Sequence, residues 1–361
     1  MKVICSLIIA SALAAGTAHA QTAASATAPA PAAVTTPELL YTMEQSVTLP
    51  STDTDWDYVK FAPGTPYLFM ARLADGLTVF DADANRAVTT LPNSKGANGP
   101  LLLPQYDRGY VAMDDGSLLS FALKSLKVIA RTQLAKDGGL NSGMLDVATG
   151  RIHFITGTRA AESTWFTLDP TTGTLLGTTR FPFRKMDDPA TDGKGTLYAP
   201  ARLDGIVLKL DARTLKEQAR WDVGCNVSKL KWQASTARLI GACTGDKPAV
   251  FVLDPATGKV TARVTIGGGL DALVIDDARQ RIVSSNYDGS MSVVRQDGPD
   301  ALTLLGTVRT QFGARMMDMD HRTGRLLLVN ADSTESPAGP NGKSVTRYHP
   351  DSFRVETWTP R

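Results

Sequence analysis

Alternating apolar residues that end in an aspartate recur along the last three-quarters of the chain. A short turn and a second run of β-forming residues follow each copy. Clear copies occupy residues 77–81, 166–169, 207–211 and 250–254, and weaker copies end at Ala122, Gln296 and His349. The alternation predicts strands, and a repeat of about 42 residues is typical of a four-stranded propeller blade. Seven copies therefore predict an all-β, seven-bladed β-propeller of four-stranded antiparallel blades over residues 38–361.

Turn-forming residues recur at equivalent positions of the copies. Asp-Gly pairs such as Asp75-Gly76 separate the second strand from the third, because glycine accepts the positive φ that a tight hairpin needs. The repeated aspartate opens turns such as DPTTG at 169–173 and DPATG at 254–258, where its carboxylate accepts bonds from the backbone N–H groups ahead of it. We therefore expect these aspartates to cap turns and not to catalyse a reaction.

Two segments compete for the outer strand of the last blade. Residues 39–50 (LLYTMEQSVTLP) form an additional copy of a fourth strand ahead of the first blade, and residues 353–360 form a candidate fourth strand at the end of the chain. An N-terminal strand that joins the last blade closes the ring and removes open sheet edges. The pattern leaves open which of the two segments is outermost.

Three stretches of the repeat resemble the YVTN-repeat, or YncE-like, family of bacterial secreted propellers. They are LTVFDADANRAVTTL (77–91), VFVLDPATGKVTARVTI (250–266) and VSSNYDGSMSVV (283–294). The resemblance covers about residues 38–361 and implies the propeller fold. Its motifs are structural and the functions of the family are diverse, so the resemblance carries over no catalytic residue.

The N-terminus, residues 1–20, has the features of a cleaved secretion signal. Lys2 supplies a positive start, residues 3–15 form an apolar stretch, and AHA at 18–20 is a small-x-small cleavage site. The apolar stretch is too short for a membrane span. We expect a mature protein in the periplasm or outside the cell, with a flexible Ala/Pro/Thr-rich spacer over residues 21–37. An uncleaved anchor is the alternative.

The charge of the mature chain is nearly balanced. The signal contains Lys2 and no acidic residue, so its removal leaves 37 basic against 36 acidic residues. This balance disfavours nucleic acid, whose binding depends on neutralising phosphates. We expect a monomer that does not insert into membranes and that binds a protein or a small anionic ligand.

Two cysteines, Cys225 and Cys243, follow the signal. They lie at the start of the first strand and the end of the second strand of the fifth blade, and a turn at 233–237 folds them nearly opposite each other. In an oxidising compartment such a pair forms a cross-strand disulfide. The alternative is two reduced, buried cysteines, and either state has a structural role.

Polar residues recur in the loops that lead into the first strand of each blade. These loops share one face with the loops between second and third strands, so we expect both sets to surround the mouth of the central channel. The first set comprises Asp57, Asn98, Asn141, Lys185, Asn226, Asp271 and Arg315. The second set comprises Arg72, Arg159, Arg202, Asn286 and Asn330, beside a long insertion at 332–344.

Two kinds of ligand suit these side chains. Oxygen ligands for Ca²⁺ or another divalent cation are candidates at Asp57, Asn98, Asn141, Asn226 and Asp271. Contacts to a carboxylate, a phosphate or an acidic protein segment are candidates at Arg72, Arg159, Arg202, Asn286, Arg315 and Asn330. The structural alternative is that Asn and Asp begin strands because they favour turns, and that the arginines are solvated.

Methionines near the C-terminus suggest a soft-metal site. Met317, Met319 and His321 alternate, so a strand would turn them to one side. Thioether and imidazole groups bind Cu(I). Core packing by methionine is the alternative.

Linear catalytic motifs are absent from the sequence, which has no Gly-x-Ser-x-Gly, His-Glu-x-x-His or Cys-x-x-Cys. We therefore predict a non-enzymatic binding module that recognises a protein, peptide or small anionic ligand on the channel-mouth face, and we expect no cofactor. The alternative is a metal-assisted, lactonase-like hydrolase that uses the Asp/Asn ring to polarise a carbonyl. A third interpretation is a structural or adhesion scaffold.

Overall fold

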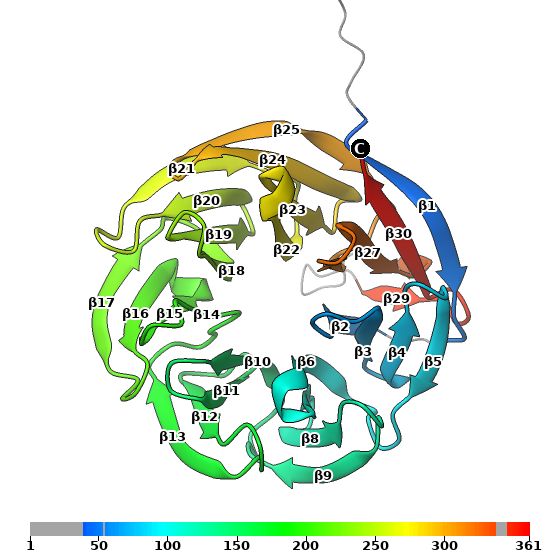
Figure 1. Ribbon diagram of the computed structural model, residues 1–361, viewed down its shortest axis with the longest axis horizontal. Coiled ribbons are helices and arrows are strands. Elements are labelled where there is room, and N and C mark those ends of the chain that lie inside the picture. The colour runs from blue at the N-terminus through cyan, green and yellow to red at the C-terminus, as the bar shows by residue number, and fades with distance from the viewer. Residues whose placement is uncertain (1–38, 53–54, 337–344) are drawn as a thin grey trace, which may run out of the picture. The chain divides into compact units, whose positions relative to one another are not determined.

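The structure is a computed structural model that describes residues 39–52, 55–336 and 345–361. The predicted signal (1–20) and spacer (21–37) lie outside the described residues. Seven four-stranded antiparallel sheets surround a common centre (Figure 1). The described chain is therefore the predicted seven-bladed β-propeller.

Each blade places its first strand innermost. The first blade contains β2 (Trp56–Phe61), β3 (Tyr67–Arg72), β4 (Gly76–Asp81) and β5 (Arg86–Thr90). The second contains β6 (Ala97–Leu103), β7 (Arg108–Met113), β8 (Ser117–Ala122) and β9 (Val128–Gln133). The third contains β10 (Leu140–Asp146), β11 (Arg151–Thr156), β12 (Ser163–Leu168) and β13 (Leu175–Phe181). The fourth contains β14 (Ala190–Thr191), β15 (Thr196–Ala201), β16 (Ile206–Asp211) and β17 (Glu217–Asp222).

The remaining blades continue the same order. The fifth contains β18 (Asn226–Gln233), β19 (Arg238–Thr244), β20 (Ala249–Leu253) and β21 (Val260–Thr265). The sixth contains β22 (Leu270–Asp276), β23 (Arg281–Asn286), β24 (Ser290–Gly298) and β25 (Ala301–Arg309). The seventh contains β26 (Met316–Asp320), β27 (Arg325–Asn330), β30 (Arg354–Pro360) and β1 (Tyr41–Thr48). Three single-turn 3₁₀ helices lie in connections: η1 (Pro104–Tyr106), η2 (Arg202–Asp204) and η3 (Asp277–Arg279).

The N-terminal strand closes the ring. Strand β1 pairs with β30 and is the outermost strand of the seventh blade (Figure 1). The C-terminal segment is therefore the third strand of that blade, and not its fourth. The predicted third strand ending at His349 is wrong: β29 (Thr346–Tyr348) pairs with β28 (Ser333–Glu335) in a separate hairpin. The segment between β27 and β30 interrupts the repeat, and its strand β29 has a short apolar pattern like that of a blade strand.

Burial follows the position of a strand within its blade. The first five residues of β4 are buried, whereas every residue of the outer strand β5 is exposed. Aromatic side chains join neighbouring blades: Phe69 stacks on Phe121 with ring centroids 5.7 Å apart, and Tyr110 packs on Phe154 at 6.2 Å. Each such buried side chain contributes about 1.5–3 kcal/mol of transfer free energy, so the blades are stabilised mainly through their middle strands.

The repeated aspartates cap turns, as predicted. The Oδ1 atom of Asp169 accepts bonds from the N–H groups of Thr171 and Thr172 at 2.9 and 2.8 Å. These backbone bonds lower the pKa of Asp169 because they favour its charged form. Gly76 of the first Asp-Gly turn has φ +100°, and a Cβ there would lie 2.6 Å from the hydroxyl oxygen of Ser94. Its conformation and its surroundings both require glycine.

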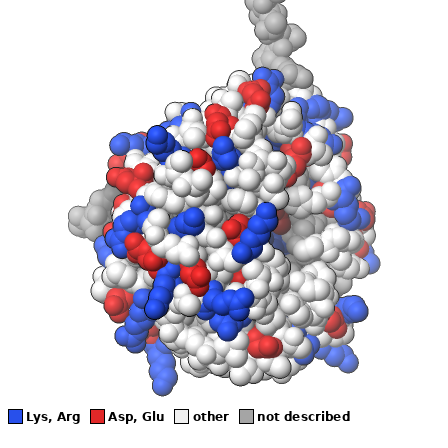
Figure 2. Space-filling model, turned by 60° about the vertical axis from the view of Figure 1, so that its left-hand side comes forward, with Lys and Arg blue, Asp and Glu red and all other residues white. Residues whose placement is uncertain are grey.

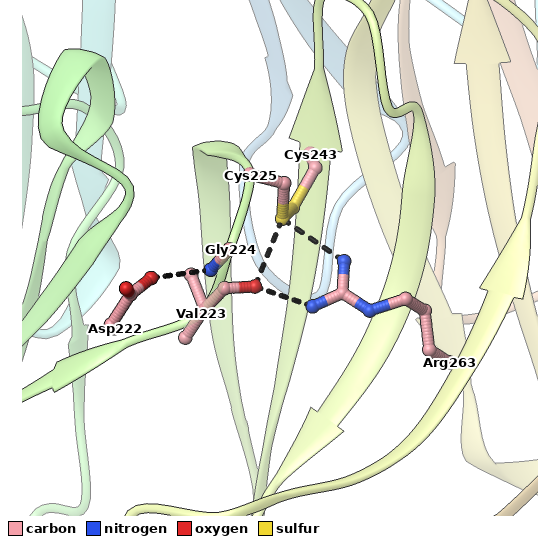
Figure 3. Close-up of a disulfide and its surroundings, with 6 residues drawn as sticks. All are labelled: Asp222, Val223, Gly224, Cys225, Cys243 and Arg263. Carbon is pink, nitrogen blue, oxygen red and sulfur yellow. Dashed lines mark hydrogen bonds between the residues drawn. A yellow bond between two sulfur atoms is a disulfide. The ribbon is translucent and has the colours of Figure 1, made fainter.

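A disulfide joins Cys225, just before β18, to Cys243 in β19 (Figure 3). The two Cα atoms are 5.8 Å apart, within the usual range for a disulfide. The guanidinium of Arg263 donates to the sulfur of Cys225 at 3.1 Å and also to the carbonyl of Val223. The crosslink and this arginine hold the loop that leads into the fifth blade.

Candidate functional site

A polar pocket of about 420 Å³ lies at the mouth of the central channel. Its walls come from the beginnings of inner strands, from the loops before them and from the ends of second strands, so residues distant in sequence meet there. Charged residues around it are Asp55, Asp57, Lys185, Asp187, Arg202, Lys229, Asp271 and Arg315. A volume of this size accommodates a small molecule or one side chain of a partner.

Arg315 is fixed at one side of the pocket. Its guanidinium donates to the carbonyl of Trp56 at 2.8 Å and to the carboxylate of Asp55, and its Nε lies 3.6 Å from Asp271 Oδ2. Burial by itself would lower the pKa of Arg315, but Asp271 and Asp55 outweigh burial and raise it. The side chain is therefore a permanent cation whose charge is already balanced.

Asp187 occupies another side of the pocket and is 2% exposed. It accepts bonds from Asn141 Nδ2 at 3.2 Å, Arg202 Nη1 at 2.8 Å and Ser228 Oγ at 3.3 Å. The ammonium of Lys185 lies 3.6 Å away. Four donors around one buried carboxylate hold the loop before β14 against its neighbouring blades.

A bond between the first and fifth blades crosses the channel below this pocket. Lys229 Nζ donates to the hydroxyl of Tyr58 at 3.2 Å and forms an ion pair with Asp188 Oδ2 at 3.4 Å. Burial would lower the pKa of Lys229, but Asp188 and Asp271 outweigh it and raise that pKa. Burial likewise would raise the pKa of Asp188, yet Lys229 and nearby lysines lower it. Both groups are therefore charged at neutral pH.

Asp57 differs from the other carboxylates of the pocket. It makes no hydrogen bond or ion pair with any of the residues that the structure describes. Burial, reinforced by the negative charge of Asp271, raises its pKa to about 8. At neutral pH the carboxyl therefore mostly keeps its proton.

Four of the five predicted metal ligands line the pocket: Asp57, Asn98, Asn141 and Asp271. Asn226 is exposed and lines a separate surface pocket of about 280 Å³ beside Cys225. The amide of Asn98 donates to the carbonyl of Leu140 at 2.7 Å, a structural role. In residues 39–52, 55–336 and 345–361, no three or more His, Cys, Asp or Glu side chains form a group that could hold a metal ion.

The predicted ligand contacts are divided between the pocket and the scaffold. Arg202 and Arg315 line the pocket. Arg72 is 3% exposed and donates to the Pro50 carbonyl at 2.7 Å and to Asp75 at 2.6 Å. The remaining three, Arg159, Asn286 and Asn330, donate to backbone carbonyls, serine hydroxyls and a glutamate, respectively.

The proposed copper ligands do not share an environment. Met317 and Met319 are 3% and 2% exposed and belong to the apolar cluster of the seventh blade and its neighbours. His321 follows the end of β26 and is exposed. The methionines therefore fill the core.

Sequence reasoning missed four polar residues of the channel wall: Tyr58, Asp187, Asp188 and Lys229. The sequence does contain a pattern that could have identified Lys229. Lys229 and Lys231 alternate with the buried Leu230 on an inner strand, and a polar residue at every second position of such a strand must face the channel. The Asp187-Asp188 pair precedes a two-residue strand, too short for its alternation to be recognised.

Neither family models nor curated proteins match the chain. Among solved structures, a chain of the crystal structure of the mitotic checkpoint complex is similar, with a TM-score of 0.69 and 14% identity over 94% of this chain and 98% of that chain. At this identity the similarity shows the fold alone, and it agrees with the propeller described above. Within the described residues, no helix has the length and apolar character required to cross a bilayer.

Proposed function

We propose that the protein is a non-enzymatic binding module of the YVTN-repeat, YncE-like type, exported to the periplasm or the cell exterior, and that its channel mouth receives a basic group of a protein or peptide partner. The observation that carries this proposal is the carboxyl of Asp57, which faces the pocket without a partner among the described residues. The signal-like N-terminus and the repeat support the location and the family.

The charges of the pocket favour a cationic group over an anionic one. The charge of Arg315 is balanced by Asp55 and Asp271. Arg202 and Lys185 both form ion pairs with Asp187. An anionic ligand would have to displace one of these carboxylates. An ammonium or guanidinium group needs no displacement, because it would pair with Asp57 and ionise it. Charge-assisted bonds of this kind contribute roughly 1.5–3 kcal/mol each.

The test is calorimetric titration of the full-length protein with two short peptides that differ only in a central lysine or norleucine. We expect the lysine peptide to bind more tightly and to lose that advantage in Asp57→Asn. Asp204→Asn, at an exposed aspartate outside the pocket, is the matched control. Affinity should rise as the pH approaches about 8, because the bound ammonium needs the ionised carboxylate.

A peptide with a central glutamate decides between this proposal and the sequence prediction of an anionic ligand. Binding of the glutamate peptide that Arg202→Ala abolishes would favour the anionic ligand. Equal binding of the lysine and norleucine peptides would contradict the proposal. The similar propeller chain comes from a complex of proteins, which supports a protein partner by analogy only.

A metal-assisted hydrolase remains the second candidate, favoured by the shared pocket of Asp57, Asn98, Asn141 and Asp271. A carboxyl whose pKa is near neutrality is suited to general base catalysis. Metal analysis after gentle purification, together with a panel of lactones, tests this candidate. Bound metal and lactone turnover that Asp57→Asn abolishes would favour the hydrolase over the binding module.

A further inference from the structure

A second, smaller cavity lies deeper in the channel, beyond the bond between Tyr58 and Lys229. Its volume is about 10 Å³, roughly the space that one water-sized species needs. Charged side chains facing it are Lys60, Lys229, Lys231, Asp188 and Asp271. Lys60 is on β2 of the first blade and Lys231 is on β18 of the fifth, and these two strands belong to different walls of the channel (Figure 1).

Among the residues that line this cavity, ammonium groups outnumber carboxylates. Three ammonium groups face two carboxylates, and each carboxylate already has a nearby basic partner. Asp188 pairs with Lys229 at 3.4 Å, and Asp271 lies 3.6 Å from Arg315. The ammonium groups of the remaining two lysines, Lys60 and Lys231, form no hydrogen bond or ion pair with any residue that the structure describes.

The environment of these two lysines disfavours two positive charges. The charge of Lys60, together with burial, lowers the pKa of Lys231 to about 8. Lys60 has an aromatic neighbour, since its Nζ lies 5.6 Å from the ring centroid of Tyr58, but a ring face does not replace a counter-ion. Enclosed ammonium groups without a directly paired counter-ion are unfavourable, and a bound anion would relieve the repulsion between them.

We propose that the cavity is a binding site for a small inorganic anion of halide size, chloride being the probe of choice, held between the ammonium groups of Lys60 and Lys231. The volume excludes a phosphate or a peptide carboxylate. Met316 and Met317 form part of the wall, so the site combines two charges with an apolar surface. This suits a monatomic anion, which needs no directional donors beyond the two ammonium groups.

Chloride line broadening in ³⁵Cl NMR, measured on the full-length protein, tests the proposal. We expect broadening that saturates with chloride, and at least about tenfold weaker binding in Lys60→Met and in Lys231→Met, the loss of one charge-assisted bond. Lys127→Met, at an exposed lysine of the second blade, should bind like the wild type. Equal broadening in wild type and both channel variants would overturn the proposal.

Crystals soaked in bromide provide a test that does not depend on the folding of a variant. The expected result is an anomalous peak between the two ammonium groups in the wild-type protein. Bromide at surface positions with none in the channel would overturn the proposal.

The pH dependence adds a third measurement. Lys231 is faced by Lys60 on β2, Lys229 on its own strand β18, Asp188 before β14 and Asp318 on β26. We expect chloride affinity to fall as the pH rises through about 8, because Lys231 loses its proton there. Lys231→Arg should still bind chloride and should lose this pH dependence. An affinity that is flat through this range in the wild type would contradict the assigned role of Lys231.

Discussion

Aspartate occurs both in the turns at the blade edges and in the wall of the channel, but its pKa is lowered in the first place and raised in the second. Asp169, in a turn between strands, accepts two backbone N–H bonds and its pKa is lowered. Asp57, in the channel wall, is enclosed beside Asp271, and its pKa is raised to about 8. The donors around a carboxylate, and not its identity, decide whether it stabilises the fold or stays available to a ligand.

The outer surface of the protein carries charges of both signs. Acidic and basic side chains are interspersed on the side shown in Figure 2, in agreement with the near balance of 38 basic and 36 acidic residues. Such a surface does not steer ligands of one sign strongly. The selectivity we propose therefore resides in the enclosed channel.

The buried ion pair of Lys229 with Asp188, in the channel wall, should show the largest effect. We expect Lys229→Met to lower the free energy of unfolding by about 3–5 kcal/mol, because Asp188 is left enclosed and unbalanced. Urea denaturation of wild type and variant measures the difference. The double variant Lys229→Met/Asp188→Leu should recover most of the loss. If Lys229→Met is as stable as the wild type, the ion pair does not hold the segment before β14 against the fifth blade.

Loss of the disulfide should have the next largest effect. Cys225 and Cys243 are separated by 18 residues in sequence, and a loop of that size corresponds to about 3 kcal/mol of unfolded-state entropy. We expect the double variant Cys225→Ser/Cys243→Ser to be less stable by about this amount in denaturant unfolding under oxidising conditions. Under reducing conditions the wild type and the variant should become similar. Equal stability under oxidising conditions would show that the crosslink contributes little.

The contrast between the two aspartates predicts opposite dependences on pH. Asp57 has a raised pKa, so the folded state holds a proton that the unfolded state has released, and Asp57 makes stability fall as the pH rises from about 4 to about 8. Asp57→Asn should remove that decline. Urea midpoints at several pH values measure it. A decline of equal size in Asp57→Asn would show that other groups cause it.

The turn aspartates should show the smallest effect. Asp169→Ala removes two backbone acceptor bonds and should destabilise the protein by about 1 kcal/mol, with the loss diminishing as the pH falls through the lowered pKa of Asp169. Asp169→Asn, which keeps an acceptor oxygen, should retain part of the stability. Thermal unfolding compares the two variants. A larger loss of stability in Asp57→Asn than in Asp169→Ala would contradict the conclusion that Asp169 stabilises the fold and Asp57 does not.

The candidate site was predictable only in part. The loops before inner strands indicated Asp57, Asn141 and Asp271 at the mouth, because the repeat places these loops on one face. The sequence did not indicate that Arg72 donates to Asp75 and to the carbonyl of Pro50, because those contacts depend on the tertiary fold of the loops around Arg72. It also did not show that Tyr58 and Lys229, 171 residues apart, meet across the channel.

The sequence by itself determined the number of blades, most of their strands and their turn residues, because a repeat forms its own sheet from local alternation and local turns. Only the tertiary structure decided that β1 is the outermost strand and that the segment ending at His349 belongs to a side hairpin. It also decided which charges in the channel are balanced and which are not. Ring closure and charge pairing join distant segments, and no local pattern encodes the distance between them.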